Sequence, residues 1–312
     1  MPTIKKQIKF SGVGIHSGVP VNMVVKPSKE RGILFYRRDI GGEKILAHFD
    51  NVGDTKMRNT TIGDLNGAHV KTIEHLMAAL FIAGVDSAIV EIDGAETPIL
   101  DGSAFEFYNA IINCGVTDGK IKKIIVKRPV VVTAREALRQ VSFLTRIKIY
   151  FMNWISHRKM DGFVKLAPCE NAKLNINATL VYSEKIIGKQ SFSYSYDGTK
   201  KSITEFVKNV ARARTFGKYS EWEYLKSHGM ARGANENNVI ALNNDGDGTL
   251  NKLFWPDEFV RHKIIDVIGD MFTSGGMVVG NLETYKGSHA MNNMVIKKLF
   301  SNPGNYDIID EK

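Results

Sequence analysis

The spacing of apolar residues in the first part of the chain predicts strands followed by two helices. Residues 4–10 and 21–25 alternate between polar and apolar side chains, which is typical of strands with one buried face. From Ile73 to Phe81 the apolar residues recur at helical spacing, which predicts a helix over 72–83. The other elements expected here are a strand at 87–93, a turn at 98–103 and a helix at 104–113.

The second part of the chain repeats this order loosely. Its predicted elements are strands at about 124–132 and within 163–196, a helix at about 202–213, an excursion of strand and loop at 215–250, a helix at about 257–274, a strand near 277–283 and a last helix after Asn293. The basic segment 120–123 separates the two parts. We therefore predict two α/β domains, an N-terminal one at 1–122 and a C-terminal one at 123–312.

Composition and charge narrow the class of protein. The 312 residues are 43% hydrophobic and 24% charged, as in soluble globular proteins. Lys and Arg number 42 against 33 Asp and Glu, a formal charge of +9, which indicates either an anionic partner or many solvated lysines. Phosphorylated substrates, nucleic acid and acidic membrane surfaces are the candidate partners, but no DNA- or RNA-binding motif supports nucleic acid.

The two cysteines, Cys114 and Cys169, exclude both a disulfide framework and a CxxC metal pair. A reduced, cytoplasmic setting is therefore expected, and any zinc site must use nitrogen and oxygen ligands. The first residues lack the apolar core of a signal peptide. The apolar stretch 141–155 contains Arg146 and Lys148 and is too short to span a bilayer.

The candidate chemistry lies on two predicted helices. His262 and Asp266 are four residues apart, so on a helix their side chains share one face. Glu74 and His75 lie at the head of the helix near 72–83. Two histidines and one aspartate make a three-ligand zinc site with an open position for water, and a neighbouring glutamate is suited to act as general base. Each pair also has a plainer interpretation, as surface polar residues or as an acidic residue favoured at a helix start.

Six strings of residues occur in order along nearly the whole chain. They lie at 12–18, 72–80, 98–103, 213–217, 257–263 (with Asp266 and 269–270) and 289–293. Together they resemble the zinc-dependent deacetylases that remove acetate from UDP-3-O-acyl-N-acetylglucosamine, the committed step of lipid A synthesis. The resemblance implies an α+β fold of two similar β-α-α-β domains, with the sheets outside, the helices packed face to face inside and the active site between the domains.

The resemblance also implies roles for the residues of the candidate metal site. One zinc ion per chain would be held by His75, His262 and Asp266, and Glu74 would be the general base that activates water. Zinc polarises an amide carbonyl and lowers the pKa of water towards 7. Since Glu74 adjoins a ligand, the turn that delivers His75 also brings a carboxylate near the water.

Three further residues complete the implied catalytic set. His289 is similar to the charged group that stabilises the oxyanion or protonates the leaving amine, and Asp270 would hold His289 in its tautomer and raise its pKa. Thr215 resembles a hydroxyl that donates to the tetrahedral oxyanion, a contact that typically contributes about 10²–10³ in rate. Whether Glu74 alone, or Glu74 with His289, handles both protons stays open.

The implied substrate is a UDP-linked acylated glucosamine, and three residues are its expected contacts. Lys263 and Lys286 would bind phosphate or sugar groups, and Tyr182 would lie against uracil. The excursion at 215–250 would line a passage for the acyl chain, or its apolar side chains would form ordinary core. These side chains are Trp222, Tyr224, Leu225 and Met230. The lipid tail is compatible with transient contact with the inner membrane surface, and we expect a monomer.

One stretch departs from the resembled family. At about 135–160 a basic and aromatic segment interrupts what otherwise reads as a hairpin between strands near 132 and 163. We interpret it as an insertion at the hairpin tip, since each doubling of loop length costs only about 0.6 kcal/mol in closure entropy. The candidate catalytic residues lie elsewhere, so activity is expected to survive. Two other functions compete: a zinc-containing binding protein silenced by the insertion, and a basic nucleic-acid-binding protein, for which we expect only weak nonspecific binding.

Overall fold

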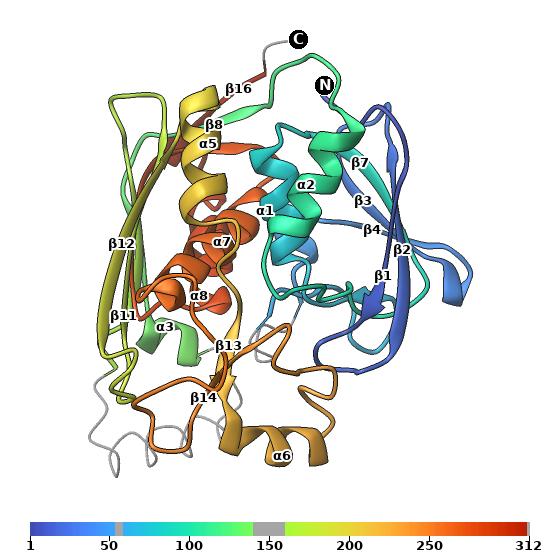
Figure 1. Ribbon diagram of the computed structural model, residues 1–312. Coiled ribbons are helices and arrows are strands. Elements are labelled where there is room, and N and C mark those ends of the chain that lie inside the picture. Colours follow the sequence, from blue (N-terminus) through green and yellow to red (C-terminus); the bar gives the residue numbers. More distant parts are fainter. Residues whose placement is uncertain (54–58, 140–159, 311–312) are drawn as a thin grey trace.

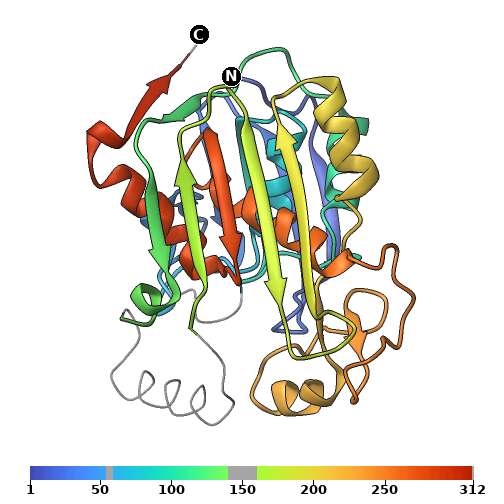
Figure 2. The same cartoon turned by 90° about the vertical axis from the view of Figure 1, so that its left-hand side faces the viewer.

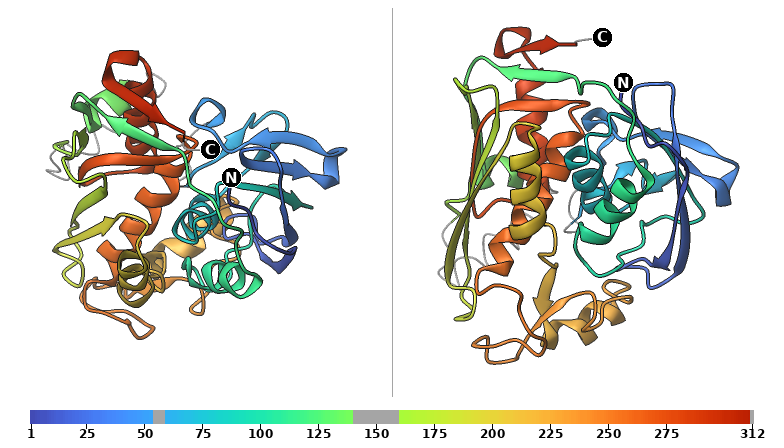
Figure 3. Two further views of the ribbon diagram at one scale, coloured as in Figure 1. Left: turned by 90° about the horizontal axis from the view of Figure 1, so that it is seen from above. Right: turned by 45° about the horizontal axis from the view of Figure 1, so that its top comes forward.

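The computed structural model describes residues 1–53, 59–139 and 160–310, and these residues form a mixed α+β structure, as predicted. Two large sheets lie on opposite sides of the molecule, with helices between them (Figure 1; Figure 3 gives two further views). The helices are α1 (Glu74–Ile82), α2 (Phe105–Cys114), α3 (Ala134–Arg139), α5 (Lys200–Asn209), α6 (Tyr219–Ser227), α7 (Glu258–Phe272) and α8 (His289–Phe300). Among the residues described, no helix combines the length and the apolar character needed to cross a membrane.

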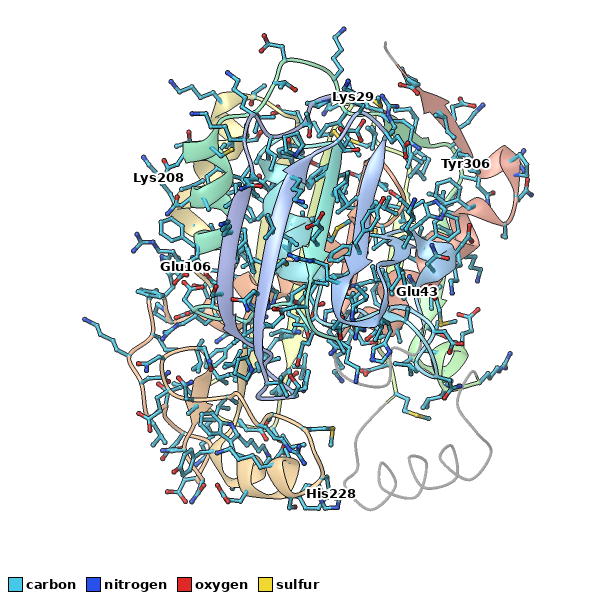
Figure 4. The ribbon with its side chains drawn as sticks, turned by 90° about the vertical axis from the view of Figure 1, so that its right-hand side faces the viewer. Lys29, Glu43, Glu106, Lys208, His228 and Tyr306 are labelled. Atoms are coloured by element: carbon cyan, nitrogen blue, oxygen red, sulfur yellow. The ribbon has the colours of Figure 1, made fainter. Side chains whose placement is uncertain are left out.

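The first sheet has the strand order β1-β2-β7-β3-β4. Its strands are β1 (Ile8–Val13), β2 (Pro20–Pro27), β3 (Gly32–Arg37), β4 (Glu43–Leu46) and β7 (Ser87–Ile92), and a separate small ribbon joins β5 (Ile62–Gly63) to β6 (His69–Val70). Alternate side chains of β2, those of Val21, Met23 and Val25, are buried in the core. The sheet therefore turns one face towards the helices, and Figure 4 looks at the molecule from the side of this sheet.

The second sheet has the order β12-β11-β15-β10-β9, and β8 pairs with β15 and in turn with β16 (Figure 2). Its strands are β8 (Lys123–Val126), β9 (Val130–Thr133), β10 (Phe163–Ala167), β11 (Leu174–Val181), β12 (Lys189–Tyr196), β15 (Met277–Tyr285) and β16 (Tyr306–Ile309). Strand β15 runs parallel to β8 and β11 and antiparallel to β10. This central strand leads directly to the start of α8, so the sheet positions that helix.

The hairpin expected around the inserted stretch is confirmed. Strands β9 and β10 pair antiparallel, with Thr133 opposite Phe163. The pairing continues one step further, where the Ala134 N–H donates to the Gly162 carbonyl oxygen at 2.8 Å. Helix α3 follows β9, and the rest of the stretch, 140–159, lies outside the described residues. The two ends of the stretch are thus hydrogen-bonded neighbours.

Two strand boundaries differ from the prediction. The single strand expected over 124–132 is two strands, β8 and β9, and Pro129 lies between them. Proline has no N–H to donate to a neighbouring strand, which explains the break. The first strand, expected at 4–10, begins at Ile8 and ends at Val13, because the residues that pair with β2 run from Ile8 opposite Val25 to Val13 opposite Pro20.

Two helices, α5 and α8, have boundaries that differ from the prediction. The last helix begins at His289, before the predicted start, and the Ser288 hydroxyl accepts a hydrogen bond from a backbone N–H of its first turn. Helix α5 begins after Thr199, whose side chain caps it in the same way, and it ends earlier than predicted because Val210 has φ −129 and ψ −48. Hydrophobic periodicity alone did not locate these caps.

The excursion predicted at 215–250 is a small unit at one end of the molecule, where Figure 4 labels His228. Strand β13 (Phe216–Lys218) pairs in parallel with β14 (Ile240–Leu242), and α6 lies between them in the sequence. Trp222 and Leu225 pack in an apolar cluster with Ile15 and Ile99, whereas Tyr224 is 63% exposed. The core interpretation therefore holds for Trp222 and Leu225.

Helices α1 and α7 are in close contact at the centre of the molecule. All residues of α1 are buried, and so are most of those of α7. Gly269 of α7 faces the backbone of α1, and a Cβ atom built on it would lie 2.0 Å from the carbonyl oxygen of Glu74. Only glycine allows the two helices to approach this closely at that point.

Gly269→Ala is expected to lower the melting temperature. In an open helix the change would add about 1 kcal/mol of stability. Here the new methyl group must push α1 away from α7, and overpacking typically costs about 1–3 kcal/mol. Thermal unfolding beside Gly67→Ala, where the nearest atom to the new Cβ would be 3.8 Å away, checks this. A melting temperature at or above that of the wild type would contradict the close packing.

Candidate metal centre

Helices α1 and α7 bring the three predicted metal ligands together. His75 is the second residue of α1, and His262 and Asp266 lie one turn apart on α7. Oδ1 of Asp266 is 3.4 Å from Nε2 of His262 and 3.8 Å from Nε2 of His75. One ligand atom from each residue lies within 4.8 Å of the others, and all three side chains are buried. Ligands of a tetrahedral zinc ion stand about 3.4 Å apart, so the cluster fits one ion.

The surroundings keep both imidazoles neutral, as metal ligands must be. Nδ1 of His262 lies 3.0 Å from the Ala213 carbonyl oxygen, which accepts its hydrogen and leaves Nε2 free for the ion. Burial lowers the pKa of His262 below its usual value. Burial also lowers the pKa of His75 to about 3, and the neighbouring His262 acts in the same direction.

The third ligand is an ionised carboxylate. Burial by itself would raise the pKa of Asp266, but the positive charges of Lys263 and His289 hold that pKa well below its usual range. Nζ of Lys263 is 2.5 Å from Oδ2 of Asp266. The lysine therefore neutralises one carboxylate oxygen, and the other lies near both imidazoles.

Glu74 is the first residue of α1, directly before a ligand. Its Oε2 atom accepts a hydrogen bond from the Thr60 backbone N–H at 3.1 Å, and its Oε1 atom is 3.8 Å from Nε2 of His289. Burial raises the pKa of Glu74 to about 8, the charge of His289 opposes this, and Asp270 adds to it. A carboxylate with a raised pKa is suited to take a proton near neutral pH.

His289 begins α8 and is hydrogen-bonded to Asp270. Nδ1 of His289 donates to Oδ2 of Asp270 at 2.8 Å, which directs Nε2 towards Glu74 and Asp266. Burial would lower the pKa of His289, but Asp270, Asp266 and Glu74 together raise it to about 9. This imidazole is therefore a cation at neutral pH, in contrast to the two histidine ligands.

Two buried side chains that the sequence did not single out complete the group. Asn292, one turn after His289 on α8, donates from Nδ2 to Oδ2 of Asp270 at 2.8 Å. The hydroxyl of Thr60 donates to Oδ1 of Asp270. Asn292 was detectable, because residues i and i+3 share a helix face. Thr60 lies outside all six strings of the resemblance, and its distance along the chain from Asp270 and His289 gives no indication that it contacts them.

Thr215 lies on the segment that holds His262. Its backbone N–H donates to the Gly102 carbonyl oxygen at 2.9 Å, two residues after the carbonyl of Ala213 that binds the histidine. A buried ion pair anchors the same segment to the start of α7, where Oε1 of Glu258 accepts from Nε of Arg214 at 2.9 Å. Thr215 therefore lies two residues along the chain from the carbonyl group that contacts His262.

The three expected substrate contacts have different surroundings. The ring of Phe216 lies 6.4 Å from that of His262, and it is also near Lys263 and Tyr182. Its centroid is 5.7 Å from Nζ of Lys263 and 5.8 Å from the ring of Tyr182, which is 42% exposed. Nζ of Lys286, in contrast, pairs with Oδ1 of Asp161 at 2.6 Å. Lys263 therefore contacts a candidate ligand, Tyr182 lies next to Phe216, and Lys286 is paired with Asp161.

A pocket opens beside the cluster, between α7, α8 and β11. Its lining includes Lys263, Asp266, His289, Thr179 and Ser288. It places an ammonium, a ligand carboxylate and the cationic imidazole around one space. Apolar side chains, among them Leu180 and Val267, line the same space. The pocket therefore combines charged groups with an apolar wall next to the candidate metal site, and a metal ion, a base and an acid are the groups that metal-assisted hydrolysis needs.

Comparison with known proteins assigns nearly the whole chain to one family. The family model described as "LpxC: UDP-3-O-acyl N-acetylglycosamine deacetylase" matches residues 1–155 and 140–301. The two matched segments overlap over residues 140–155, within the stretch interpreted as an insertion.

Curated relatives cover almost the same length. A UDP-3-O-acyl-N-acetylglucosamine deacetylase of Nitratiruptor sp. is 36% identical over 309 residues, 99% of this chain and 93% of the relative. Proteins of the same description from Helicobacter pylori and Neisseria meningitidis serogroup C are each 34% identical, over 98% and 99% of this chain and 93% and 92% of their own length.

Proposed function

Since the chain belongs to the UDP-3-O-acyl N-acetylglycosamine deacetylase family and is a hydrolase of that kind, we propose that it removes the N-acetyl group at the cluster of His75, His262 and Asp266, with one zinc ion per chain. The reaction releases acetate from UDP-3-O-acyl-N-acetylglucosamine and is a step of lipid A biosynthesis. The observation that carries the proposal is the meeting of these three ligand atoms with Glu74 and His289 in one buried site.

The donor set supports zinc. Two neutral imidazole nitrogens and one carboxylate oxygen are ligands that zinc accepts in catalytic sites, and three protein ligands leave a position open. Zinc bound there would polarise the amide carbonyl and lower the pKa of a water molecule towards 7. The hydrogen bond from His262 to Ala213 and the ion pair of Asp266 with Lys263 would hold two of the ligands in place.

Two residues of the chain would carry out the proton transfers of the reaction. Glu74 would take a proton from the attacking water, because its buried carboxylate has a raised pKa. His289, kept cationic by Asp270, would stabilise the developing oxyanion and give a proton to the leaving amine. The Glu74 and His289 atoms that would act are 3.8 Å apart. Thr215 would supply a further hydrogen bond to the oxyanion.

Substrate contacts follow from the charges around the pocket. Lys263 would meet a phosphate or sugar oxygen, and the exposed ring of Tyr182 would stack on the uracil. Lys286 would join them by exchanging its Asp161 partner for a substrate oxygen. The excursion around α6 would guide the acyl chain.

We also propose that the protein is organised as two α/β domains, 1–122 and 123–312, with the site between them. The first sheet uses residues up to Ile92 and the second begins at Lys123, which supports this division. A cytoplasmic monomer that touches the inner membrane surface transiently would meet its lipid-linked substrate there. The formal charge of +9 suits both that surface and a UDP diphosphate.

Acetate release from UDP-3-O-acyl-N-acetylglucosamine by the purified chain, with and without a chelator, tests the function. Chelator-sensitive turnover is expected. A folded, zinc-loaded chain without turnover would favour the other candidate, a zinc-containing binding protein silenced by the insertion.

Deleting 140–159 and joining the ends with a short Gly-Ser linker is expected to leave turnover within about threefold of the wild type. The reason is that Ala134 and Gly162 are already hydrogen-bonded neighbours, so the hairpin closes without the stretch. Kinetics and thermal unfolding of the deletion variant would check this. An unfolded or inactive product would show that the stretch contributes to the fold or to the site.

A further inference from the structure

Thr60 contacts residues from three different helices. Its backbone N–H donates to Oε2 of Glu74 on α1 at 3.1 Å, and its hydroxyl donates to Oδ1 of Asp270 on α7. The same hydroxyl oxygen is 3.3 Å from Nδ1 of His289 on α8. The residue is 2% exposed, so water does not compete for these contacts.

The hydroxyl determines how the Asp270 carboxylate is oriented. A carboxylate rotates through a broad range about its terminal bond unless its oxygens are held. Thr60 occupies Oδ1, which leaves Oδ2 to accept from Nδ1 of His289 and from Nδ2 of Asn292, each at 2.8 Å. With Oδ2 directed in this way, Nε2 of His289 points towards Glu74 and Asp266.

The backbone N–H of Thr60 orients a second catalytic group, Glu74. It binds Oε2 of Glu74, and Oε1 remains as the oxygen nearest to His289, at 3.8 Å from Nε2. One residue thus orients both groups that the proposed reaction uses for proton transfer. The two orientations are coupled, because the N–H and the hydroxyl belong to the same residue.

Thr60 is itself held against the turn before α1. Its carbonyl oxygen accepts from the Ile73 N–H at 3.3 Å. Next to it, Nδ2 of Asn59 donates to the Thr72 hydroxyl at 3.1 Å, and that hydroxyl donates to the buried Glu96 at 3.0 Å. A side chain supported in this way has little freedom to move when substrate binds.

We propose that Thr60 is a positioning residue for the deacetylation reaction, which holds Glu74 and the Asp270–His289 pair in one relative orientation. The inference rests on the proposed function, because it assigns Thr60 to the base and acid named there. It gives the hydroxyl a role in turnover that is separate from substrate binding and from metal binding.

Thr60→Val tests the hydroxyl alone, because valine has nearly the same shape and keeps the backbone N–H to Glu74. We expect kcat to fall about 10–100-fold, as for other partners that orient active-site groups, with KM within about threefold and the zinc content unchanged. Thr60→Ser, which keeps a hydroxyl, is expected to recover most of the activity. If the valine variant does not fold, Thr60→Ala provides the same comparison.

Thr61→Val is the matched control. Thr61 is equally buried and next in the chain, but its hydroxyl donates to Oδ1 of Asn59 at 3.0 Å and not to a catalytic group. It should lose stability like Thr60→Val while keeping kcat within about threefold of the wild type. A Thr60→Val kcat equal to that of Thr61→Val would overturn the inference.

Nitrogen-15 NMR of the histidine side chains in the metal-free protein gives a second readout, with the His289 signal identified from a His289→Gln sample. The Nδ1–H resonance of His289 should shift in Thr60→Val and not in Thr61→Val. If the wild type releases no acetate, the proposed function fails and this resonance alone decides the role of Thr60. A shift confined to Thr60→Val supports that role, and equal spectra overturn it.

Discussion

Glu74→Gln is expected to lower kcat for acetate release by about 10³-fold, the middle of the range for loss of a general base. Glutamine keeps the shape of the side chain and still accepts the Thr60 N–H through its amide oxygen, but it cannot take a proton from water. KM should change little, because the carboxylate acts on the water and not on the bound sugar. Steady-state kinetics of the purified variant measure both constants.

The zinc content of Glu74→Gln must equal that of the wild type for this interpretation, since Glu74 adjoins the ligand His75. Glu91→Gln is a suitable control, because Glu91 lies on β7 and pairs with Lys26, away from the cluster. Its kinetics should match those of the wild type. A Glu74→Gln enzyme within about tenfold of the wild type, with zinc bound, would mean that another group accepts the proton, and His289 would then be the first candidate.

Removing the metal is expected to abolish turnover, and returning zinc is expected to restore it. His262→Ala should have the same effect without a chelator, because only one imidazole and one carboxylate would remain to hold the ion. Activity and bound zinc should therefore fall together. The exposed His228, whose Nδ1 contacts the Tyr224 carbonyl oxygen, offers His228→Ala as a control with normal zinc content.

Thermal unfolding provides a readout of the metal that does not depend on the reaction. A ligand that binds only the folded state stabilises it by about 2.7 kcal/mol at a hundredfold excess over Kd. Zinc should therefore raise the melting temperature of the metal-free wild type and leave that of His262→Ala almost unchanged. Turnover that persists in thoroughly chelated protein, or an equal thermal shift in both proteins, would contradict the assignment of the ligands.

The sequence allowed the ligands to be found because their geometry is mostly local. His262 and Asp266 share a face at any i, i+4 spacing on a helix, and Glu74 adjoins His75 in the chain. The protonation of the histidines, in contrast, depends on the buried charged groups that the tertiary structure brings around them. The two candidate ligands His75 and His262 have lowered pKa values, whereas the pKa of His289 is raised, because Asp270, Asp266 and Glu74 surround it. No pattern of neighbours along the chain distinguishes these cases.

The element boundaries that differed from the prediction also separate local features, which the sequence contains, from features that depend on the tertiary structure. The start of α8 depends on the cap at Ser288, a local feature that hydrophobic spacing overlooks. Pro129 divides a strand through its missing N–H, which is also visible in the sequence once a sheet is assumed. The pairing of β8 with β15 on one side and with β16 on the other, in contrast, joins segments from distant parts of the chain.

By itself, the sequence determined the α+β class, the helices that carry the ligands, the family and the residue types of a metal-dependent hydrolase. Only the tertiary structure decided that Thr60 joins Glu74 to Asp270, that Gly269 lets α1 meet α7, and that Lys286 pairs with Asp161. The physical reason is the distance along the chain over which each kind of interaction acts. Helical periodicity and turn chemistry act over a few residues and can be read along the chain, whereas these contacts join residues that only the packing of separate elements brings together.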